Sequence, residues 1–426
     1  MSIYTFTFLR HGESEGNVRA LFQGQRDYPL TTRGREQARA LGAYWAANSQ
    51  TFDGVIASPL SRTLDTAKLV TAPLTLPITT DEIWMERDFG IHSDDNYETY
   101  YQRGLGPAMN HPYLPFGKTG ESLFETFIRG ASAINSLLKR PPGHYLVVSH
   151  GEFLNAVLHV VLGIPPQANG NGMRFIFRNT GYAQIRYDTS EHIWHVKTLN
   201  QAPHRDSRSE FWQADRENIR LTLVRHGESE GNLKKLWQGQ MEFPLTEKGR
   251  EQARTLAAYF VEKEIQFDSV IASPQSRALE TAQIVTDRLG GSLKTDDIWK
   301  ERHNGKYAGT HQDDRHDEPA FHHLYRKLGD TGESLWELYL RAGNAVQQAT
   351  HFPAGHHLIA AHGGILSAFV RAAIGIIPQA QFRGTRFHFG NTTVCEMIFV
   401  PQISQWRLLG FNNTNHLTDL ATFPGE

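Results

Sequence analysis

The sequence predicts two tandem α/β domains, each with three layers in which helices cover both faces of a mostly parallel central sheet. Three observations lead to this fold class. The octapeptide that begins at Arg10 recurs unchanged from Arg225 to Asn232, about half the chain later. Within each half, strand-like and helix-like segments alternate, which is typical of α/β domains. Some of the strand-like runs are continuously apolar, as expected for central strands that are covered on both faces.

The first elements of copy one are predicted as follows. Residues 5–9 form a short run of Thr, aromatic and apolar residues that ends at Arg10, which favours a strand. Residues 32–47 carry apolar side chains at helical spacing. Residues 55–57 are a short buried strand. Ser58 is predicted to cap a helix that has Pro59 as its first residue and continues to Val70.

The remaining elements of copy one continue the alternation. Residues 145–148 are continuously apolar and predict a central strand that ends at His150. An apolar helix is expected from there to Leu162. Residues 174–187 and 193–199 are predicted to form further strands.

The repeat sets the domain boundaries that we expect. We predict domains at 1–202 and 218–412, a polar linker at 203–217, and a C-terminal tail at 413–426 that is partly disordered. Two domains of roughly 200 residues each agree with the chain length.

Composition excludes several classes of function. A net charge of −2 and a pI of about 6.9 give no electrostatic footprint for nucleic acid or an acidic membrane surface. Cys395 is the only cysteine, so no intramolecular disulfide can form. We find neither a signal peptide nor an apolar run of membrane-spanning length, and we therefore expect a cytoplasmic protein.

Three predicted strands of copy one are followed directly by polar residues. These are His11, Ser58 and His150. In an open α/β sheet, ligands bind beyond the carboxyl ends of the strands. The three residues are therefore expected to converge on one site.

The stretch Arg10-His11-Gly12-Glu13 resembles the signature of the histidine phosphatase superfamily, also called phosphoglycerate mutase-like. The resemblance covers nearly the whole chain, because Gln23-Gly24-Gln25, Pro29-Leu30-Thr31 and Gly120-Glu121-Ser122 also recur in copy two. Gln-Gly-Gln followed by Pro-Leu-Thr is similar to the broad-specificity phosphatase branch. The resemblance implies the three-layer fold described above and a histidine acid-type phosphatase, that is, a phosphoric monoester hydrolase.

In this family the histidine of the signature becomes phosphorylated, which makes His11 the expected nucleophile. Arg10 and Arg62 carry guanidinium groups that suit bidentate binding of a phosphate. Arg62 also falls in the first turn of its predicted helix, where free backbone N–H groups favour an anion.

The resemblance implies further roles. His150 would donate a hydrogen bond to the transferring phosphoryl group. Glu86 matches the family's acid, which protonates the leaving oxygen and then deprotonates water. Asn17 and Gln23 match positions that contact phosphate oxygens, although capping or turn roles stay open for both.

Copy two carries the same set, so both copies are predicted to be catalytic. Its members are Arg225, His226, Asn232, Gln238, Arg277, Glu301 and His362.

We expect no metal and no other cofactor, because the arginines and histidines supply the positive field. The histidine-rich stretch from His311 to His323 matches no defined metal motif, and a polar loop is expected there. The expected partner is a small phosphomonoester substrate. Whether the two domains pack on each other stays open.

Two alternatives remain. One is a cofactor-dependent phosphoglycerate mutase, since Glu301-Arg302-His303-Asn304-Gly305 is similar to the mutase form of the acid motif. The short stretches from Glu86 to Glu121 and from Glu301 to Glu333 favour hydrolysis, because mutases carry a long insertion there. The other alternative is one catalytic domain beside a regulatory or phospho-ligand-binding pseudo-domain.

Overall fold

The computed structural model describes residues 2–104, 111–166, 174–204, 217–315, 324–378 and 385–417. The chain divides into two compact units, Met1–Asp206 and Ser207–Glu426. Most of the predicted linker and the end of the predicted tail lie outside the described residues. Among the described residues, every helix is too short or too polar to traverse a lipid bilayer.

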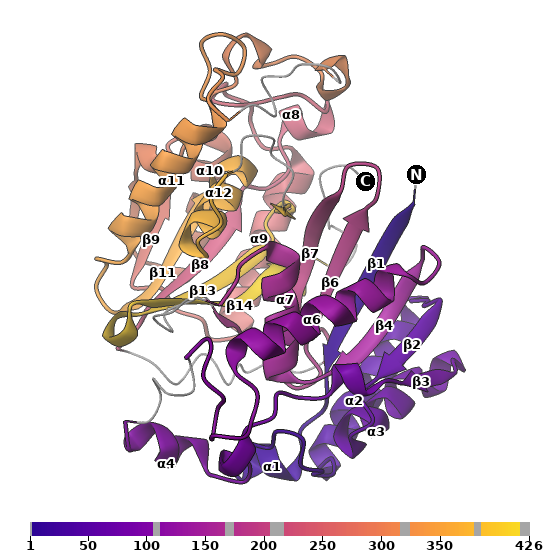
Figure 1. Ribbon diagram of the computed structural model, residues 1–426. Coiled ribbons are helices and arrows are strands. Elements are labelled where there is room, and N and C mark those ends of the chain that lie inside the picture. Colours follow the sequence, from indigo (N-terminus) through magenta and orange to yellow (C-terminus); the bar gives the residue numbers. More distant parts are fainter. Residues whose placement is uncertain are drawn as a thin grey trace. The chain divides into compact units, whose positions relative to one another are not determined.

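The N-terminal unit is built on a sheet with the strand order β7-β6-β1-β4-β2-β3 (Figure 1). Strands β1, β4, β2 and β3 are parallel to one another, and β6 pairs with β1 and with β7 in antiparallel fashion. The described strands are β1 (Ile3–Arg10), β2 (Gly54–Ala57), β3 (Ile78–Thr80), β4 (His144–Ser149), β5 (Arg174–Phe175), β6 (Tyr182–Asp188) and β7 (Ile193–Gln201). The described helices are α1 (Glu15–Val18), α2 (Thr32–Ala47), α3 (Ser61–Thr71), α4 (Tyr97–Gln102), α6 (Leu123–Leu138) and α7 (Gly151–Leu162).

Helices cover both faces of this sheet because successive strand residues point to opposite sides. On one face, Leu9 and Val148 belong to a buried cluster with Leu41 of α2 and Val70 of α3. On the other face, the ring of Phe8 lies 6.0 Å from that of Trp84, which in turn contacts Phe153 of α7. The predicted three layers are therefore present.

The C-terminal unit repeats this plan with the order β10-β9-β11-β8-β13-β14. Its strands are β8 (Ile219–Arg225), β9 (Ser269–Ala272), β10 (Leu293–Thr295), β11 (Gly355–Ala361), β12 (Arg386–Phe387), β13 (Val394–Val400) and β14 (Gln405–Asn413). Its helices are α8 (Glu230–Leu233), α9 (Glu247–Glu262), α10 (Ser276–Leu289), α11 (Leu335–Ala349) and α12 (Gly363–Ala373). A buried cluster joins Leu256 of α9, Val285 of α10 and Leu358 of β11. Cys395 is fully buried in β13.

Two predicted elements differ from the structure. The helix expected to begin after Ser58 begins at Ser61, because Leu60 is extended (φ −61°, ψ 139°) and not helical. The strand expected over 174–187 is split into β5 and β6. Thr180 has a left-handed backbone (φ 53°) and interrupts the strand between them.

The start of the predicted tail is also ordered. Leu417 is fully buried, and the ring of His416 lies 3.3 Å from the hydroxyl of Thr392. His204 makes the equivalent contact with Thr180 in the N-terminal unit, at 2.9 Å. These contacts extend both units slightly past the last strand.

Candidate active site

The parallel strands bring two histidines to one edge of each sheet. Arg10 at the end of β1 is opposite Ser149 at the end of β4, so His11 and His150 leave the sheet side by side. Their ring centroids are 5.3 Å apart. In the C-terminal unit, the rings of His226 and His362 are 5.2 Å apart in the same arrangement.

The first histidine of each pair has a defined tautomer. Nδ1 of His11 lies 2.7 Å from the carbonyl oxygen of Gly12, which can only accept a hydrogen bond. The proton of the neutral ring therefore resides on Nδ1, and Nε2 keeps its lone pair. Burial and the charges of Arg62 and Arg10 hold the pKa of His11 well below its usual value. His226 makes the same contact with Gly227, also at 2.7 Å, and its pKa is lowered by the same causes.

The second histidine is held by a serine. Nε2 of His150 lies 2.9 Å from Oγ of Ser58, and the side chain is fully buried. Among the described residues, no hydrogen-bond partner contacts its Nδ1. Burial, followed by the charge of Arg62, lowers the pKa of His150 well below its usual value. His362 contacts Ser273 in the same way, at 2.8 Å.

The two predicted arginines of each unit lie at the histidines and are anchored by backbone carbonyls. Arg62 is almost fully buried in the first turn of α3 and donates to the carbonyl oxygens of Arg26 and Gly24, at 2.7 and 2.8 Å. Burial lowers its pKa to about 10. Arg10 donates to the carbonyl oxygen of Phe177 at 2.6 Å. Fixed guanidinium groups beside a histidine form a binding site suited to a phosphate dianion.

The C-terminal unit repeats these anchors. Arg277 donates to the carbonyl oxygens of Met241 and Gly239, at 2.9 and 2.8 Å, and Arg225 donates to that of Phe389 at 2.7 Å. Burial lowers the pKa of both arginines to about 10.

Glu86 is placed against the N-terminus of α7. Its carboxylate accepts hydrogen bonds from the backbone N–H groups of Glu152 and Phe153, at 3.2 and 2.8 Å. Burial, followed by the charge of Glu152, raises the pKa of Glu86 above its ordinary value. A carboxyl group with a raised pKa is better suited to proton transfer near neutral pH. In the C-terminal unit, Glu301 accepts from the N–H groups of Gly364 and Ile365, at 2.9 and 3.2 Å.

Asn17 and Gln23 are joined through Ser14. Oδ1 of Asn17 closes the capping box of α1, and Oε1 of Gln23 accepts from the hydroxyl of Ser14 at 2.8 Å. The capping role that the sequence left open for Asn17 is therefore present. These contacts use the side-chain oxygens of Asn17 and Gln23 as acceptors. A phosphate needs hydrogen-bond donors, and the side-chain amide nitrogens of the two residues supply them. Asn232 and Gln238 make the same contacts with Ser229.

Sequence reasoning gave no role to Asn179 and Thr180, although the pair recurs as Asn391 and Thr392. Nδ2 of Asn179 donates to the carbonyl oxygen of His11 at 3.1 Å and to Oδ1 of Asn17 at the same distance. The backbone N–H of Thr180 donates to the carbonyl oxygen of His11 at 3.2 Å. The turn that splits β5 from β6 thus fixes the backbone of the segment that carries His11. The recurrence of this Asn-Thr pair was the available signal.

A second missed feature holds Glu86 in place. Arg129 of α6 pairs with Glu121 at 2.6 Å and donates to the carbonyl oxygens of Ile83 and Met85, at 2.9 and 2.7 Å. Its guanidinium also lies over the ring of Phe153, 4.0 Å from the centroid. We call Arg129 with Glu121 the acid-loop clamp. Arg341 and Glu333 form the same clamp in the C-terminal unit.

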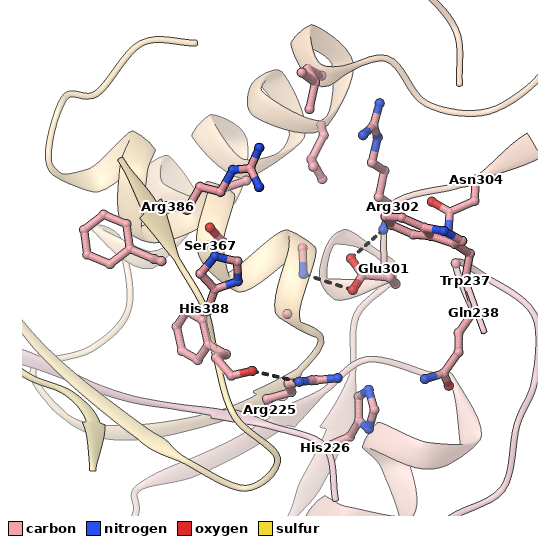
Figure 2. Close-up of a pocket in the computed structure, with 18 of the residues that line it drawn as sticks. Arg225, His226, Trp237, Gln238, Glu301, Arg302, Asn304, Ser367, Arg386 and His388 are labelled. Atoms are coloured by element: carbon pink, nitrogen blue, oxygen red, sulfur yellow. Dashed lines mark hydrogen bonds between the residues drawn. The ribbon is translucent and has the colours of Figure 1, made fainter. Parts of the chain in front are cut away.

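A cavity of about 430 Å³ opens over the histidine of the C-terminal unit. Figure 2 shows Arg225 and His226 at one end of it, with Glu301, Arg302 and Arg386 beyond them in this view. Gln238, Asn232 and Arg277 also line it. The cavity therefore extends well past the space that a single phosphate needs.

Within the described ranges, no group of three or more His, Cys, Asp or Glu side chains could hold a metal ion. Nδ1 of His311 lies 3.4 Å from a carboxylate oxygen of Asp313. The rest of that histidine-rich stretch, residues 316–323, lies outside the described residues.

Comparison with known proteins identifies the repeat. A family model described as the histidine phosphatase superfamily (branch 1) matches residues 6–202 and 221–414. A probable phosphoglycerate mutase GpmB from Salmonella choleraesuis is 32% identical over 209 residues, which cover 47% of this chain and 94% of the relative.

Two solved structures are also similar. One is a putative alpha-ribazole-5'-P phosphatase from Escherichia coli, at 24% identity and a TM-score of 0.41, covering 47% of this chain and 97% of that one. The other is a phosphoserine phosphatase from Entamoeba histolytica, at 24% identity and a TM-score of 0.41, covering 47% of this chain and 98% of that one.

Proposed function

Because the chain belongs to the histidine phosphatase superfamily, in two tandem copies, and is thus an enzyme acting on phosphate esters, we propose that it hydrolyses phosphomonoesters through a phosphohistidine in each unit. One observation carries the proposal. Nε2 of a buried, neutral His11 keeps its lone pair between two anchored arginines, and the arrangement recurs at His226.

The first step transfers the phosphoryl group to the enzyme. Nε2 of His11 attacks phosphorus while the P–O bond to the leaving group breaks, and protonated Glu86 gives its proton to the leaving oxygen. The contact of Nδ1 with Gly12 supports this step, since the carbonyl stabilises the positive charge that the ring acquires.

The second step releases phosphate. Glu86, now ionised, takes a proton from water as the water oxygen attacks phosphorus. The P–N bond breaks, and its electron pair returns to Nε2. The neutral ring of His11 and the protonated carboxyl group of Glu86 are thereby restored.

His150 is proposed to stabilise the transferring group. With the hydroxyl of Ser58 donating to Nε2, the ring proton lies on Nδ1, which has no acceptor among the described residues and can donate to a phosphoryl oxygen. Such donors contribute where negative charge develops in the transition state.

We propose that this chemistry needs no metal ion. Arg10 and Arg62 provide two fixed positive charges against a phosphate dianion, and the first turn of α3 adds backbone N–H groups. Activity should therefore persist in EDTA.

The direct test compares His11→Ala, His226→Ala and the double variant on a phosphomonoester panel in EDTA. Each single variant should keep the turnover of the other unit, and the double variant should have none. The exposed His351→Ala serves as the control for histidine removal and should match the parent. Turnover in the double variant would contradict a phosphohistidine mechanism, and complete loss in one single variant would show that the other unit is a pseudo-domain.

A mutase is the second candidate function, because the curated relative above is named a probable phosphoglycerate mutase. Incubation with 3-phosphoglycerate and 2,3-bisphosphoglycerate separates the two activities. We expect release of inorganic phosphate to outpace isomerisation. The reverse order would favour the mutase.

A further inference from the structure

We propose that Asn304 selects the leaving group of the C-terminal unit by hydrogen-bonding to a hydroxyl that the leaving group carries. Phe89 stands at the same position of the N-terminal unit, which therefore favours leaving groups without that hydroxyl. The inference rests on the proposed function, because it concerns the alcohol that is released when the phosphomonoester is cleaved.

Asn304 is placed close to the proposed chemistry. It follows Glu301 by three residues, and both residues line the cavity over His226. Its side chain packs on Gly239, because a Cβ atom built on that glycine would lie 3.1 Å from Cγ and Nδ2 of Asn304. The carbonyl oxygen of Gly239 is in turn one of the two that hold Arg277. Asn304 therefore lies beside the proposed phosphate site, in the segment that carries the proposed acid.

The side-chain amide of Asn304 has no local structural role. Asparagine is a favoured N-cap residue, and Asn304 directly precedes the 3-10 helix Gly305–Tyr307, yet its side chain makes no capping hydrogen bond. Among the described residues, only the N–H of Tyr307 bonds to Asn304, and it donates to the backbone carbonyl oxygen.

The amide of Asn304 is nevertheless buried, since the residue is only 5% exposed. Buried side-chain amides are normally hydrogen-bonded, so an amide that lines a cavity without a protein partner is available to a ligand. An amide offers both donors and an acceptor, and a hydroxyl can use either. The site thus suits a neutral hydroxyl group.

An aromatic side chain completes this part of the cavity. Trp237, two residues before Gly239, also lines it. Figure 2 shows the indole of Trp237 and the side chain of Asn304 on the same side of the cavity in this view. Aromatic faces bury carbon–hydrogen surface, while a few polar groups fix the orientation of a ligand. The substrate class is therefore a phosphomonoester whose alcohol carries a further hydroxyl, as in the phosphates of polyols and sugars.

The N-terminal unit has an aromatic ring at the position of Asn304. Phe89 packs on Gly24 in the corresponding way, because a Cβ atom on that glycine would lie 3.3 Å from Cδ2 of the ring. The centroid of this ring lies 5.2 Å from that of Phe22 and 5.6 Å from that of Phe116. A hydroxyl placed against a phenyl ring loses its water without gaining a hydrogen bond, which disfavours a hydroxylated leaving group.

The test uses the full chain with one nucleophile silenced. Protein carrying His11→Ala reports the C-terminal unit, and protein carrying His226→Ala reports the N-terminal unit. The substrates are butyl phosphate and its 2-hydroxy, 3-hydroxy and 4-hydroxy derivatives, which move the hydroxyl along the same carbon chain. The measured quantity is kcat/KM for each hydroxybutyl phosphate divided by that for butyl phosphate.

We expect a ratio of about 10 or more for the C-terminal unit with at least one hydroxybutyl phosphate, and a ratio of about 1 or less for the N-terminal unit. Asn304→Leu keeps the approximate volume and removes the amide, and it should lower the ratio of the C-terminal unit to about 1. The matched Phe89→Leu should leave the ratio of the N-terminal unit at about 1 or less.

A ratio taken within one protein is insensitive to partial loss of folded protein, and the effect of the hydroxyl on the leaving oxygen itself is common to both units. Equal ratios in the two silenced proteins, or a ratio that Asn304→Leu does not change, would overturn the role of Asn304 while leaving the phosphatase activity intact. Absence of turnover by the His11→Ala protein on all of these esters and on 4-nitrophenyl phosphate would instead refute the proposed function of the C-terminal unit, and the role of Asn304 with it.

Discussion

The backbone, and not a neighbouring side chain, selects the nitrogen that we propose as the nucleophile of each unit. Gly12 presents its carbonyl oxygen to Nδ1 of His11, which leaves Nε2 for phosphorus. The sequence predicts that a histidine follows the first strand, but it cannot show which ring nitrogen is occupied. That choice depends on the path of the chain after the strand, which only the fold defines.

At the same scale, Glu86 is the residue whose role is most easily mistaken for a structural one. If it protonates the leaving oxygen, Glu86→Gln should reduce kcat/KM about 10²-fold or more for an alkyl phosphate. The loss should be much smaller for 4-nitrophenyl phosphate, whose leaving group needs no proton. The assay is made with His226→Ala present, so that only the N-terminal unit turns over.

The parallel variant, Glu301→Gln with His11→Ala present, tests the C-terminal unit. An equal loss on both substrates would show that the glutamate only shapes the site. It would then be a binding or structural group, as the contacts of Glu301 with Gly364 and Ile365 also allow.

At the scale of elements, helix α6 holds the loop that carries Glu86. The acid-loop clamp ties Ile83 and Met85, on either side of Trp84, to Arg129 of that helix. The sequence revealed the Gly-Glu-Ser turn as a repeat, but not that Glu121 pairs with an arginine two turns into the next helix.

We predict that Arg129→Met lowers kcat/KM of the N-terminal unit about tenfold and has the same dependence on the leaving group as Glu86→Gln. The reason is that the loop carrying Glu86 loses its three carbonyl contacts with Arg129, and Glu121 loses its ion pair. In the double variant with Glu86→Gln, the loss of Arg129 should add little, since coupled residues are not additive. Additive losses would mean that Arg129 acts through another route.

Element boundaries show where sequence patterns succeed and fail. The helix over 32–47 has the predicted bounds because its N-cap Thr31 and apolar spacing agree. The predicted helix after Ser58 is wrong at its start because Leu60 is extended, while the hydroxyl of Ser58 contacts His150. A pattern of local residues cannot register a partner that lies in a distant strand.

At the scale of the whole molecule, several buried histidines stay neutral in the fold. Burial lowers the pKa of His144 to about 4 and those of His356 and His416 to about 3. The unfolded chain has ordinary histidines, with a pKa near 6.5. Below that value the unfolded state binds protons that the folded state does not, so the free energy of unfolding falls as the pH falls.

We therefore expect urea midpoints to fall between pH 7 and pH 5, with little change between pH 7 and pH 8. His356→Gln should reduce this dependence by up to about 2 kcal/mol of unfolding free energy at pH 5. The exposed His351→Gln should have no such effect. A stability that is constant from pH 7 to pH 5 would contradict buried neutral histidines.

The duplication itself was evident from the sequence, since the octapeptide and its companion motifs recur. The individual contacts that distinguish the copies were not. Arg174 pairs with Glu152 in the N-terminal unit, whereas the C-terminal unit has Gly364 at the position of Glu152. The repeat therefore identifies motifs that both copies share, but not contacts between residues that differ from one copy to the other.

The measurement that tests the central claim most directly is isomer-specific detection of phosphohistidine after a rapid alkaline quench of the turning-over enzyme. Phosphate on Nε2 of His11 and on Nε2 of His226 is the predicted result, each signal disappearing in the corresponding alanine variant. Phosphate on Nδ1, on any other residue, or on no residue while substrate is consumed would contradict the account.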